Sequence, residues 1–480
     1  MPAAISGVLI VIATGLLARE VLLTKKNKAI AWRPGLIAMF LTAISPWAII
    51  FSRAAWEVNL ATALLTWGIW FGLRFLNQNQ TRWLLASFLS LALSMYAYHA
   101  ARIIAPLIGL LILSCWLRQF LRQTTSKKLS SFLNRESGVI IGLGLFFMFL
   151  ISPILLALGS NQLAQRFAET SIFTNLSVIE ESNQAKELAG NSITARLFYH
   201  RYVFFALQVF KNFFSHFQLD FLFISGDVNP RHSVQYLGQL YHFELILLFL
   251  GLVFLFKNWH RNKMILLAWL IIGILPASIT KAAPHALRTL LVMPTIMTLS
   301  TMGLIELWQL VSKIKLPTKW LTKRISKTGF LFVLAAIYLV EFSMFWRYYT
   351  QIYPQVYAHE WQFGYEEMVA AVTQLEQQQP ELPVYLSRHQ GRPAMYYWFY
   401  TQTDPGLVQQ ANQQVAKDQG EFLAFENKFF IDQVEVIQAP AIVALSPTEF
   451  ESLRQRYQVD KLERIFAPNG KLVWLVGQLE

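Results

Sequence analysis

The sequence contains few charged residues and a single cysteine. Asp, Glu, Lys and Arg make up 14% of its 480 residues, whereas soluble globular chains average about 25%. Hydrophobic residues make up 55%, which leaves too little polar surface for a soluble protein of this length. The composition therefore predicts a membrane protein with several spans. The one cysteine, Cys115, lies in an apolar run, which excludes an intramolecular disulfide and a cysteine-ligated metal cluster.

Motifs for nucleotide and protease chemistry are also missing. The chain has no P-loop, no GxGxxG and no HExxH sequence, which argues against a nucleotide-driven pump or a membrane zinc protease. No group of residues predicts a metal ion or another cofactor. The net charge is +13, but we expect no nucleic-acid partner, because the basic residues cluster in short loops between apolar segments.

Apolar runs long enough to cross a bilayer, at roughly 20 residues each, recur along most of the chain. We therefore expect a multi-spanning α-helical membrane protein with about ten transmembrane helices. The expected spans are 3–23, 35–51, 58–76, 82–98, 103–121, 138–158, 240–257, 263–280, 287–310 and 329–349.

Basic residues alternate between the two sides of these spans. Five loops hold 20 of the 41 Lys and Arg residues, namely 25–33, 74–82, 118–135, 257–263 and 313–327. By the positive-inside rule these loops are cytoplasmic, so the long loop 159–239 and the tail lie on the outer face of the cell membrane. Residue 1 also falls outside. Either the first helix inserts with its N-terminus outside, or preceding spans are missing, which we favour.

The tail has a different composition from the rest of the chain. It is rich in Gln, and the short runs "VYLS", "AIVALS" and "KLVWLVG" read as strands, with helical stretches such as "GYEEMVAAVTQLEQ" between them. We expect a transmembrane domain over 1–350 and a small external α/β domain over 351–480.

Two groups of polar residues lie at the outer ends of the early spans. In "ISPWAIIFSRAAWEVN", Arg53 and Glu57 face the same side if they share a helix, either as an ion pair that closes the hairpin or as one wall of a substrate site. In "YAYHAAR", His99 and Arg102 are one turn apart and can hold an anion. Arg102 can equally extend to the interface as an anchor.

Two further groups lie later in the chain. In "ITKAAPHALRT", the prolines indicate a broken helix, and Lys281, His285 and Arg288 can share one side and bind a phosphate or serve as interfacial anchors. "GDVNPRHS" carries Asp227, Arg231 and His232. Asp227 can act as a base or bind a hydroxyl, although "GDVNP" is also typical of an Asx turn.

Several segments together resemble one enzyme family. "ISPWAIIFSRAAWEVNLAT", "LSMYAYHAARIIAPL", "GDVNPRHSVQYLGQLYHFEL", "APHALRTLLVMP" and "WQFGYEEMV" are similar to segments of the membrane-embedded C-type glycosyltransferases. The resemblance is to the branch of protein O-mannosyltransferase-like and aminoarabinose-transferase-like bacterial enzymes. It covers most of the chain in order, and its specificity comes from the series of segments because no single motif is diagnostic.

The resemblance implies an enzyme of the plasma membrane that moves a sugar from a polyprenyl-phosphate carrier to a glycan, lipid or protein acceptor on the outer face. This chemistry needs a carboxylate as base and cations to neutralise the departing phosphate. The residues expected to contact the phosphate or shape the cavity are Arg53, His99, Arg102, Arg231, His232, Lys281, His285 and Arg288.

The chain departs from the family pattern at its start. The family's first outer loop, with its acidic residue, has no counterpart, so the catalytic base is unknown and Asp227 and Glu57 are substitutes at best. We therefore expect the chain to be inactive alone. Two alternatives stay open: a transporter (flippase) for lipid-linked sugars or polysaccharide, and a non-catalytic membrane scaffold.

Overall fold

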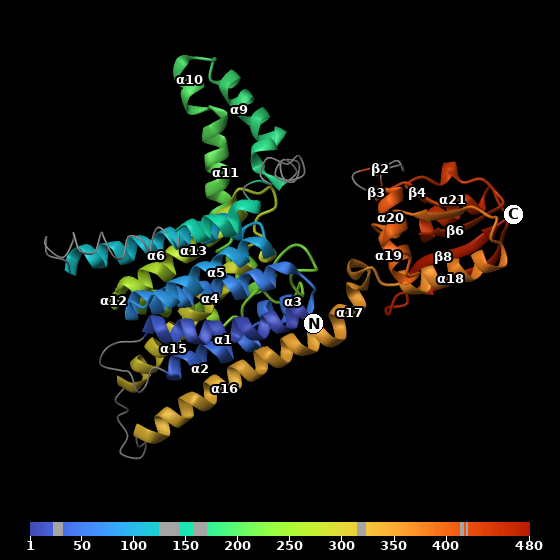
Figure 1. The fold of residues 1–480 in the computed structure, drawn as a ribbon. Coiled ribbons are helices and arrows are strands. Elements are labelled where there is room, and N and C mark those ends of the chain that lie inside the picture. Colours follow the sequence, from blue (N-terminus) through green and yellow to red (C-terminus); the bar gives the residue numbers. More distant parts are fainter. Residues whose placement is uncertain are drawn as a thin grey trace. The chain divides into compact units, whose positions relative to one another are not determined.

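The computed structural model describes residues 1–22, 32–123, 142, 144–154, 156, 170–313, 323–412, 417–418 and 421–480. The chain divides into two compact units, Met1–Phe345 and Trp346–Glu480, which Figure 1 labels by element.

Helices make up nearly all of the first unit (Figure 1). They include α1 (Pro2–Leu22), α2 (Trp32–Ile44), α3 (Pro46–Arg53), α4 (Glu57–Gln78), α5 (Thr81–Ala97), α6 (Ala101–Gln123), α9 (Leu176–Leu188), α10 (Ile193–Phe198), α11 (Arg201–Ser215), α12 (Glu244–Lys257), α13 (Arg261–Ser278), α14 (Ala286–Thr289), α15 (Met293–Lys313) and α16 (Lys323–Arg347), besides a short apolar helix over Gly144–Ile154. Shorter helical turns are η1 (Ile172–Thr174), η2 (Asp220–Ile224) and η3 (Leu290–Val292).

Five helices of the described residues are long and apolar enough to cross a membrane, or six if a bent pair counts as one span. The five are Pro2–Leu22, Ala101–Arg122, Arg261–Ser278, Ala286–Lys313 and Thr328–Val356, and the pair is Arg33–Ile44 with Pro46–Arg53. These apolar helices indicate an integral membrane protein. Three more expected spans form α4, α5 and α12, and 138–158 lies partly outside the described residues, so the count of ten stays a prediction.

The second expected span, 35–51, is not one straight helix. It breaks between α2 and α3, whose axes differ by 59°. Ser45 has extended backbone angles (φ −60°, ψ 131°), and Pro46 is the first residue of α3. A proline disfavours the helical conformation of the residue before it and supplies no N–H of its own, so the helix ends there and restarts in a new direction.

The described helix ends that flank three of the basic loops lie together with the start of α13. At the start of α13, His260 Nε2 lies 3.0 Å from the carbonyl oxygen of Val21 near the end of α1. Arg261 donates to the carbonyl of Leu76, at 3.1 Å, near the end of α4. Arg261 also bonds to Gln119 in the last turns of α6. The ends of α1, α4 and α6 therefore meet the start of α13, as expected if the basic loops alternate with the other loops between the two sides of the membrane. The side of the membrane on which these helix ends lie stays a prediction.

Two glycines let α12 and α15 cross closely. A Cβ added at Gly251 would lie 2.1 Å from the carbonyl oxygen of Leu299, and one added at Gly303 would lie 1.8 Å from that of Leu247. The backbones of α12 and α15 are thus in direct contact. Small residues allow this close approach between helices in membranes.

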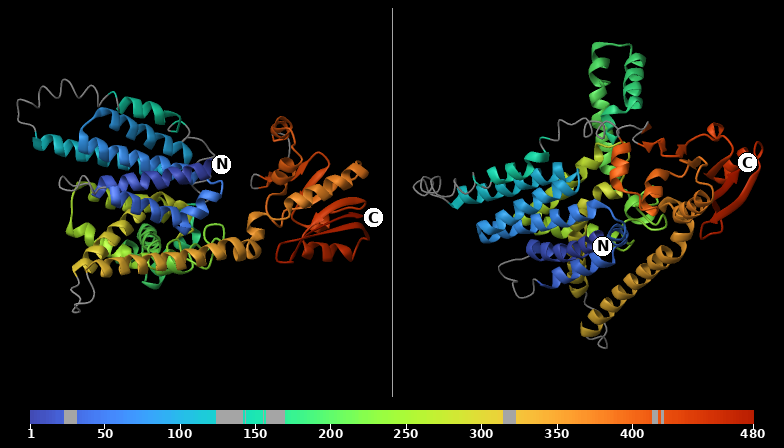
Figure 2. Two further views of the ribbon diagram at one scale, coloured as in Figure 1. Left: turned by 90° about the horizontal axis from the view of Figure 1, so that it is seen from below. Right: turned by 45° about the vertical axis from the view of Figure 1, so that its right-hand side comes forward.

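The expected outer loop 159–239 is largely helical where it is described. α9 and α11 lie side by side (Figure 2) and share a small cluster of Ile172, Val178 and Phe205. At the base of this pair, the side-chain amide of Asn212 donates to the carbonyls of Ser278 and Thr280, both at 3.0 Å. The insert is therefore anchored to the end of α13.

The second unit is a mixed sheet covered by helices. The sheet order is β4-β5-β1-β6-β8-β7, with β1 parallel to β5 and β6 and the other pairs antiparallel. The strands are β1 (Val384–Ser387), β4 (Ala424–Phe425), β5 (Lys428–Ile431), β6 (Ala441–Leu445), β7 (Val459–Phe466) and β8 (Leu472–Leu479), besides a two-stranded ribbon of β2 (Lys417–Asp418) and β3 (Glu421–Phe422). Its helical elements are η4 (Tyr348–Ile352), α17 (Tyr353–Val356), η5 (Ala358–Trp361), α18 (Tyr365–Gln378), α19 (Pro393–Tyr400), α20 (Pro405–Ala411), η6 (Val434–Val436) and α21 (Pro447–Arg454).

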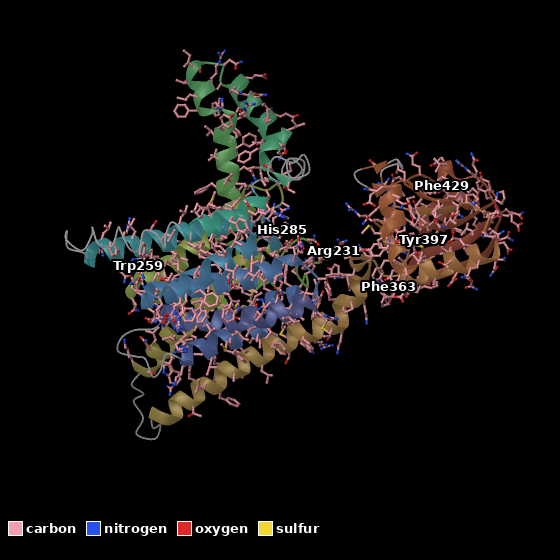
Figure 3. All side chains as sticks on the ribbon, viewed as in Figure 1. Arg231, Trp259, His285, Phe363, Tyr397 and Phe429 are labelled. Carbon is pink, nitrogen blue, oxygen red and sulfur yellow. The ribbon has the colours of Figure 1, made fainter. Side chains whose placement is uncertain are left out.

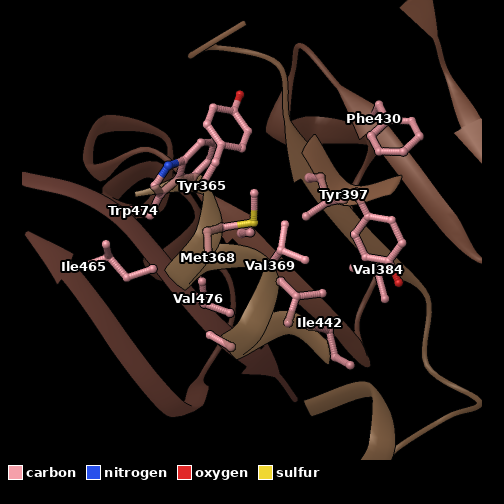
Figure 4. Close-up of a cluster of buried hydrophobic side chains, with 14 of the residues drawn as sticks. Tyr365, Met368, Val369, Val384, Tyr397, Phe430, Ile442, Ile465, Trp474 and Val476 are labelled. Carbon is pink, nitrogen blue, oxygen red and sulfur yellow. The ribbon is translucent and has the colours of Figure 1, made fainter. Parts of the chain in front are cut away.

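The three strands read from the sequence and the helix α18 are confirmed in this unit. Figure 4 shows Met368 and Val369 of α18 packed on Ile442 and Val476 of the sheet. Phe450 of α21 belongs to the second apolar cluster, on the other side of the central strands. The central strand β6 is buried along its whole length, which explains its continuous apolar sequence.

Candidate functional site

The segment after η2 folds into a tight loop built around Asp227. Gly226 precedes it with a φ of +86°, which a glycine adopts without strain. Asp227 Oδ1 accepts the backbone N–H of Asn229 at 2.9 Å, and its carbonyl accepts the hydroxyl of Ser233 at 3.0 Å. This is the Asx turn that the "GDVNP" sequence indicates, and it fixes the direction of the carboxylate.

The second oxygen of Asp227 joins segments that are distant in the sequence. Oδ2 accepts the ring N–H of His232 Nδ1 at 3.0 Å and the backbone N–H of Ala286 at 2.7 Å. Burial raises the pKa of Asp227, but the bond and charge of His232 and the N–H groups of Asn229 and Ala286 outweigh it, so the pKa lies below its ordinary value. The carboxylate is therefore charged and nearly saturated with donors.

Hydrogen bonds fix the tautomer of His216, and burial keeps both His216 and its neighbour His285 neutral. The backbone N–H of His285 donates to His216 Nε2 at 3.2 Å, and His216 Nδ1 lies 2.7 Å from the carbonyl of Asn212. This arrangement needs the neutral His216 ring with its proton on Nδ1. Burial lowers the pKa of His216 to about 4, and burial together with the charge of Arg288 lowers the pKa of His285 to about 3.

Aromatic rings from the hairpin between α3 and α4 enclose this cluster. The ring of His232 lies 5.9 Å from Phe51, 5.3 Å from Trp56 and 4.8 Å from His285, between ring centres. Trp47 of α3 donates to the carbonyl of Ala286 at 3.3 Å. The hairpin in "ISPWAIIFSRAAWEVN" thus forms a wall of the site through its aromatic residues.

Asp227, His232 and His285 form a possible metal site. One ligand atom from each lies within 4.8 Å of the others. His285 Nδ1, 3.7 Å from Asp227 Oδ2, has no hydrogen-bond partner among the described residues. Two imidazoles and one carboxylate are ligands that Zn²⁺ and similar divalent ions prefer, and a neutral His285 is in its ligating state. The residues fit a metal ion that the sequence patterns do not indicate.

Arg288 lies at the edge of the same cluster. Its Nη1 donates to the hydroxyl of Thr280 at 2.5 Å and to the carbonyl of Ala282 at 3.2 Å, and Asp227 and Tyr98 are close enough to interact with its charge. The guanidinium is only partly buried. It therefore keeps donors for an anion that approaches from the end of the helices.

Lys281, His285 and Arg288 do not lie on one helical face, as their spacing was expected to place them. Residues 279–285 are not helical, because Pro284 cannot continue a helix and restricts the residue before it. The backbone N–H of Lys281 bonds to the carbonyl of Thr170 at 2.9 Å, and the residue is exposed. The argument from helical spacing is therefore wrong, although His285 and Arg288 lie close enough to interact and Arg288 bonds to Thr280 and Ala282, the residues on either side of Lys281.

The other predicted residues lie around this end of the unit. Arg53 ends α3 and Glu57 begins α4, so they do not share a helix, and both are exposed. His99 is exposed in the turn between α5 and α6, and Arg102 Nε donates to the carbonyl of Met95 at 3.2 Å. Arg231 is half-buried in the Asp227 loop.

Sequence reasoning missed two residues that organise the site, His216 and Asn212. Both lie near the end of α11, and Asn212 contacts the chain just after α13 while His216 contacts His285. Neither stands in a motif. A lone His or Asn at the end of an amphipathic helix gives no signal until the fold supplies its partners.

The first unit is thus a helical membrane unit with a buried Asp–His cluster and an arginine at one end of its helices. No family model and no curated protein matches the chain.

Two solved structures resemble the fold weakly. ArnT from Cupriavidus metallidurans in the apo state aligns with a TM-score of 0.44 and 11% identity, over 99% of this chain and 82% of that one. ArnT bound to undecaprenyl phosphate aligns with a TM-score of 0.42 and 12% identity, over 99% and 83%. Likeness at this level assigns no residue role to this chain.

Proposed function

We propose that this protein transfers a sugar from a polyprenyl-phosphate donor to an acceptor at the membrane surface. The observation that carries the proposal is the convergence of Arg288, the neutral imidazoles of His216 and His285, and the charged carboxylate of Asp227 at one end of apolar helices. A phosphate on a lipid carrier reaches such a place while its chain stays in the bilayer. The series of segments similar to C-type glycosyltransferases supports the same donor class.

The residues divide into two roles under this proposal. Arg288 neutralises the phosphate as it departs, and a divalent ion held by Asp227, His232 and His285 would add Lewis-acid stabilisation. Asp227 accepts three hydrogen bonds, which suits an anchor better than a base. Glu57 follows Trp56, whose ring contacts His232, and it is exposed. We therefore place proton abstraction from the acceptor at Glu57.

The transporter alternative needs charged groups along the middle of the helices. Among the described residues of the first unit, the buried charged side chains in helices are Glu20, Glu244, Lys263 and Glu306. Each lies within two turns of a helix end. The described helices of the first unit therefore carry no buried charge in their middle, where a path through the unit would need one.

The test uses the full chain in lipid nanodiscs. Binding of polyprenyl phosphate and transfer from a labelled polyprenyl-phosphate sugar are both measured, so that the phosphate site is tested even if the wild type turns over slowly. Arg288→Ala should reduce binding about tenfold or more, because a charge-assisted contact to the phosphate is lost. Arg196→Ala, at an exposed arginine on α10, is the matched control and should leave binding unchanged. Equal binding by wild type and Arg288→Ala would refute the phosphate site.

The metal is tested separately in the same preparation. Wild-type protein should retain one zinc ion per chain after desalting, and His285→Ala should retain none. Because His285 Nδ1 has no hydrogen-bond partner among the described residues, this variant removes a ligand without breaking a side-chain hydrogen bond. Equal zinc content in both proteins would exclude this triad as the metal site.

A further inference from the structure

A cavity of about 950 Å³ opens at the other end of α13 from the Asp227 cluster. Figure 3 labels Trp259 at this end and His285 at the opposite one. The walls come from α2, α12, α13, α15 and α16 and are mainly apolar. They include Ile37, Phe254, Leu304, Ile305, Trp308 and Leu334. On one side the wall is α16, whose membrane segment is only 11% buried, so the cavity is bounded there by a helix that itself faces lipid.

Lys263 lines this cavity, and its charge has no balancing anion in the described part of the chain. The residue is 2% exposed. Its ammonium lies 4.3 Å from the ring centre of Phe254, and no carboxylate of a described residue is within ion-pair distance. Burying an unpaired ammonium is costly, so the site calls for an anion that the described chain does not supply.

The buried carboxylates at the same end are already paired. Glu306 accepts Lys257 at 2.6 Å, and Glu20 lies 3.7 Å from Arg74. Lys263 therefore differs from its neighbours, since the fold gives a cationic partner to each of these two acids and no acidic partner to this lysine.

Two further basic residues of the cavity, His260 and Arg33, determine which other contacts a ligand can make. Both ring nitrogens of His260 face carbonyl oxygens, at 3.1 Å from Asn258 and 3.0 Å from Val21, so the ring has no nitrogen left to bind a ligand. Arg33, exposed in the first turn of α2, also lines the cavity. An anion can thus contact one buried and one exposed cation.

We propose that this cavity binds an anionic phospholipid. The phosphate lies against Lys263 and Arg33, and the acyl chains lie along the apolar walls between α12, α15 and α16. A soluble anion would match the charge but would leave the apolar walls without a partner, and a neutral lipid would leave Lys263 unpaired. The site is independent of the proposed sugar transfer, because it lies at the opposite end of α13 and shares no residue with the Asp227 cluster.

The experiment measures the thermal stability of the full chain in detergent with added phosphatidylglycerol, with phosphatidylcholine and with glycerol phosphate. The wild type should gain several degrees from phosphatidylglycerol and far less from the other two, because a ligand that binds only the folded state stabilises it. Lys263→Met keeps the length of the side chain without its charge. It should melt at least as high as the wild type without lipid and lose the gain from phosphatidylglycerol.

Lys313→Met is the matched control, since Lys313 is an exposed basic residue at the end of α15 and does not line the cavity. It should keep the full gain. Leu334→Trp fills the apolar part of the cavity and should reduce the gain without removing a charge. An equal gain from glycerol phosphate, an equal gain from phosphatidylcholine, or an undiminished gain in Lys263→Met would each overturn the proposal.

Discussion

The substitution Asp227→Asn tests whether one carboxylate holds the site together. An asparagine can accept hydrogen bonds only through its one oxygen. If that oxygen takes the place of Oδ2, it still accepts from His232 and Ala286, but the amide nitrogen then faces the backbone N–H of Asn229. The new side-chain N–H group and the backbone N–H of Asn229 then face each other, and the buried side-chain N–H has no acceptor. The two hydrogen bonds from His232 and Ala286 remain, but their acceptor is no longer charged.

The expected cost follows from these changes. A buried donor without a partner costs about 1–3 kcal/mol, and each remaining bond weakens by about 1 kcal/mol when the acceptor becomes neutral. Together these changes destabilise the loop by about 3–5 kcal/mol. Because Asp227 is 4% exposed, solvent offers little compensation.

Hydrogen exchange read by mass spectrometry resolves this local loss. Peptides that cover 226–234 and 283–289 should exchange about a hundredfold faster in Asp227→Asn, since about 3 kcal/mol of local stability is lost. Asp220→Asn is the control, because the Asp220 carboxylate is exposed and accepts only the hydroxyl of Ser225, at 2.6 Å, within the described chain. Equal exchange in the two variants would refute the central role of Asp227.

Two further predictions concern helix packing and pH. Gly303→Ala should lower the melting temperature markedly, because the added Cβ would overlap a backbone carbonyl of α12. Gly329→Ala is the control and should not lower it, because the space around Gly329 is open. Equal melting temperatures of the two variants would contradict the close crossing of α12 and α15. The unfolded chain, with histidine pKa values near 6.5, binds more protons than the native one, in which the pKa values of His216 and His285 are about 4 and 3. The free energy of unfolding should therefore fall as the pH drops from about 6.5 toward 4, by up to about 3 kcal/mol for His216. Melting curves at pH 7 and pH 5 with a chelator present check this, and a constant melting temperature would count against neutral buried histidines.

Local sequence patterns predicted the secondary structure and the turns that depend only on residues close together in the chain. The apolar runs became helices, and "VYLS", "AIVALS" and "KLVWLVG" became β1, β6 and β8, because burial on both faces of a strand leaves a continuous apolar run. The Asx turn at Asp227 was also readable, since its donor is two residues away. The Ser-Pro pair indicates the break at Ser45, whereas the apolar run alone predicts one straight span.

The sequence by itself determined that this chain is a helical membrane protein with a polar tail, and that its polar residues gather near the ends of spans. Composition and periodicity suffice for this, because hydrophobic burial acts on every residue alike. Only the tertiary structure decided which of those polar residues meet. Asp227 bonds to Ala286, 59 positions away, and His216 bonds to His285. These contacts depend on directions set by the Asx turn, the break before α14 and the packing of α11 on α13, and hydrogen bonds require both distance and direction.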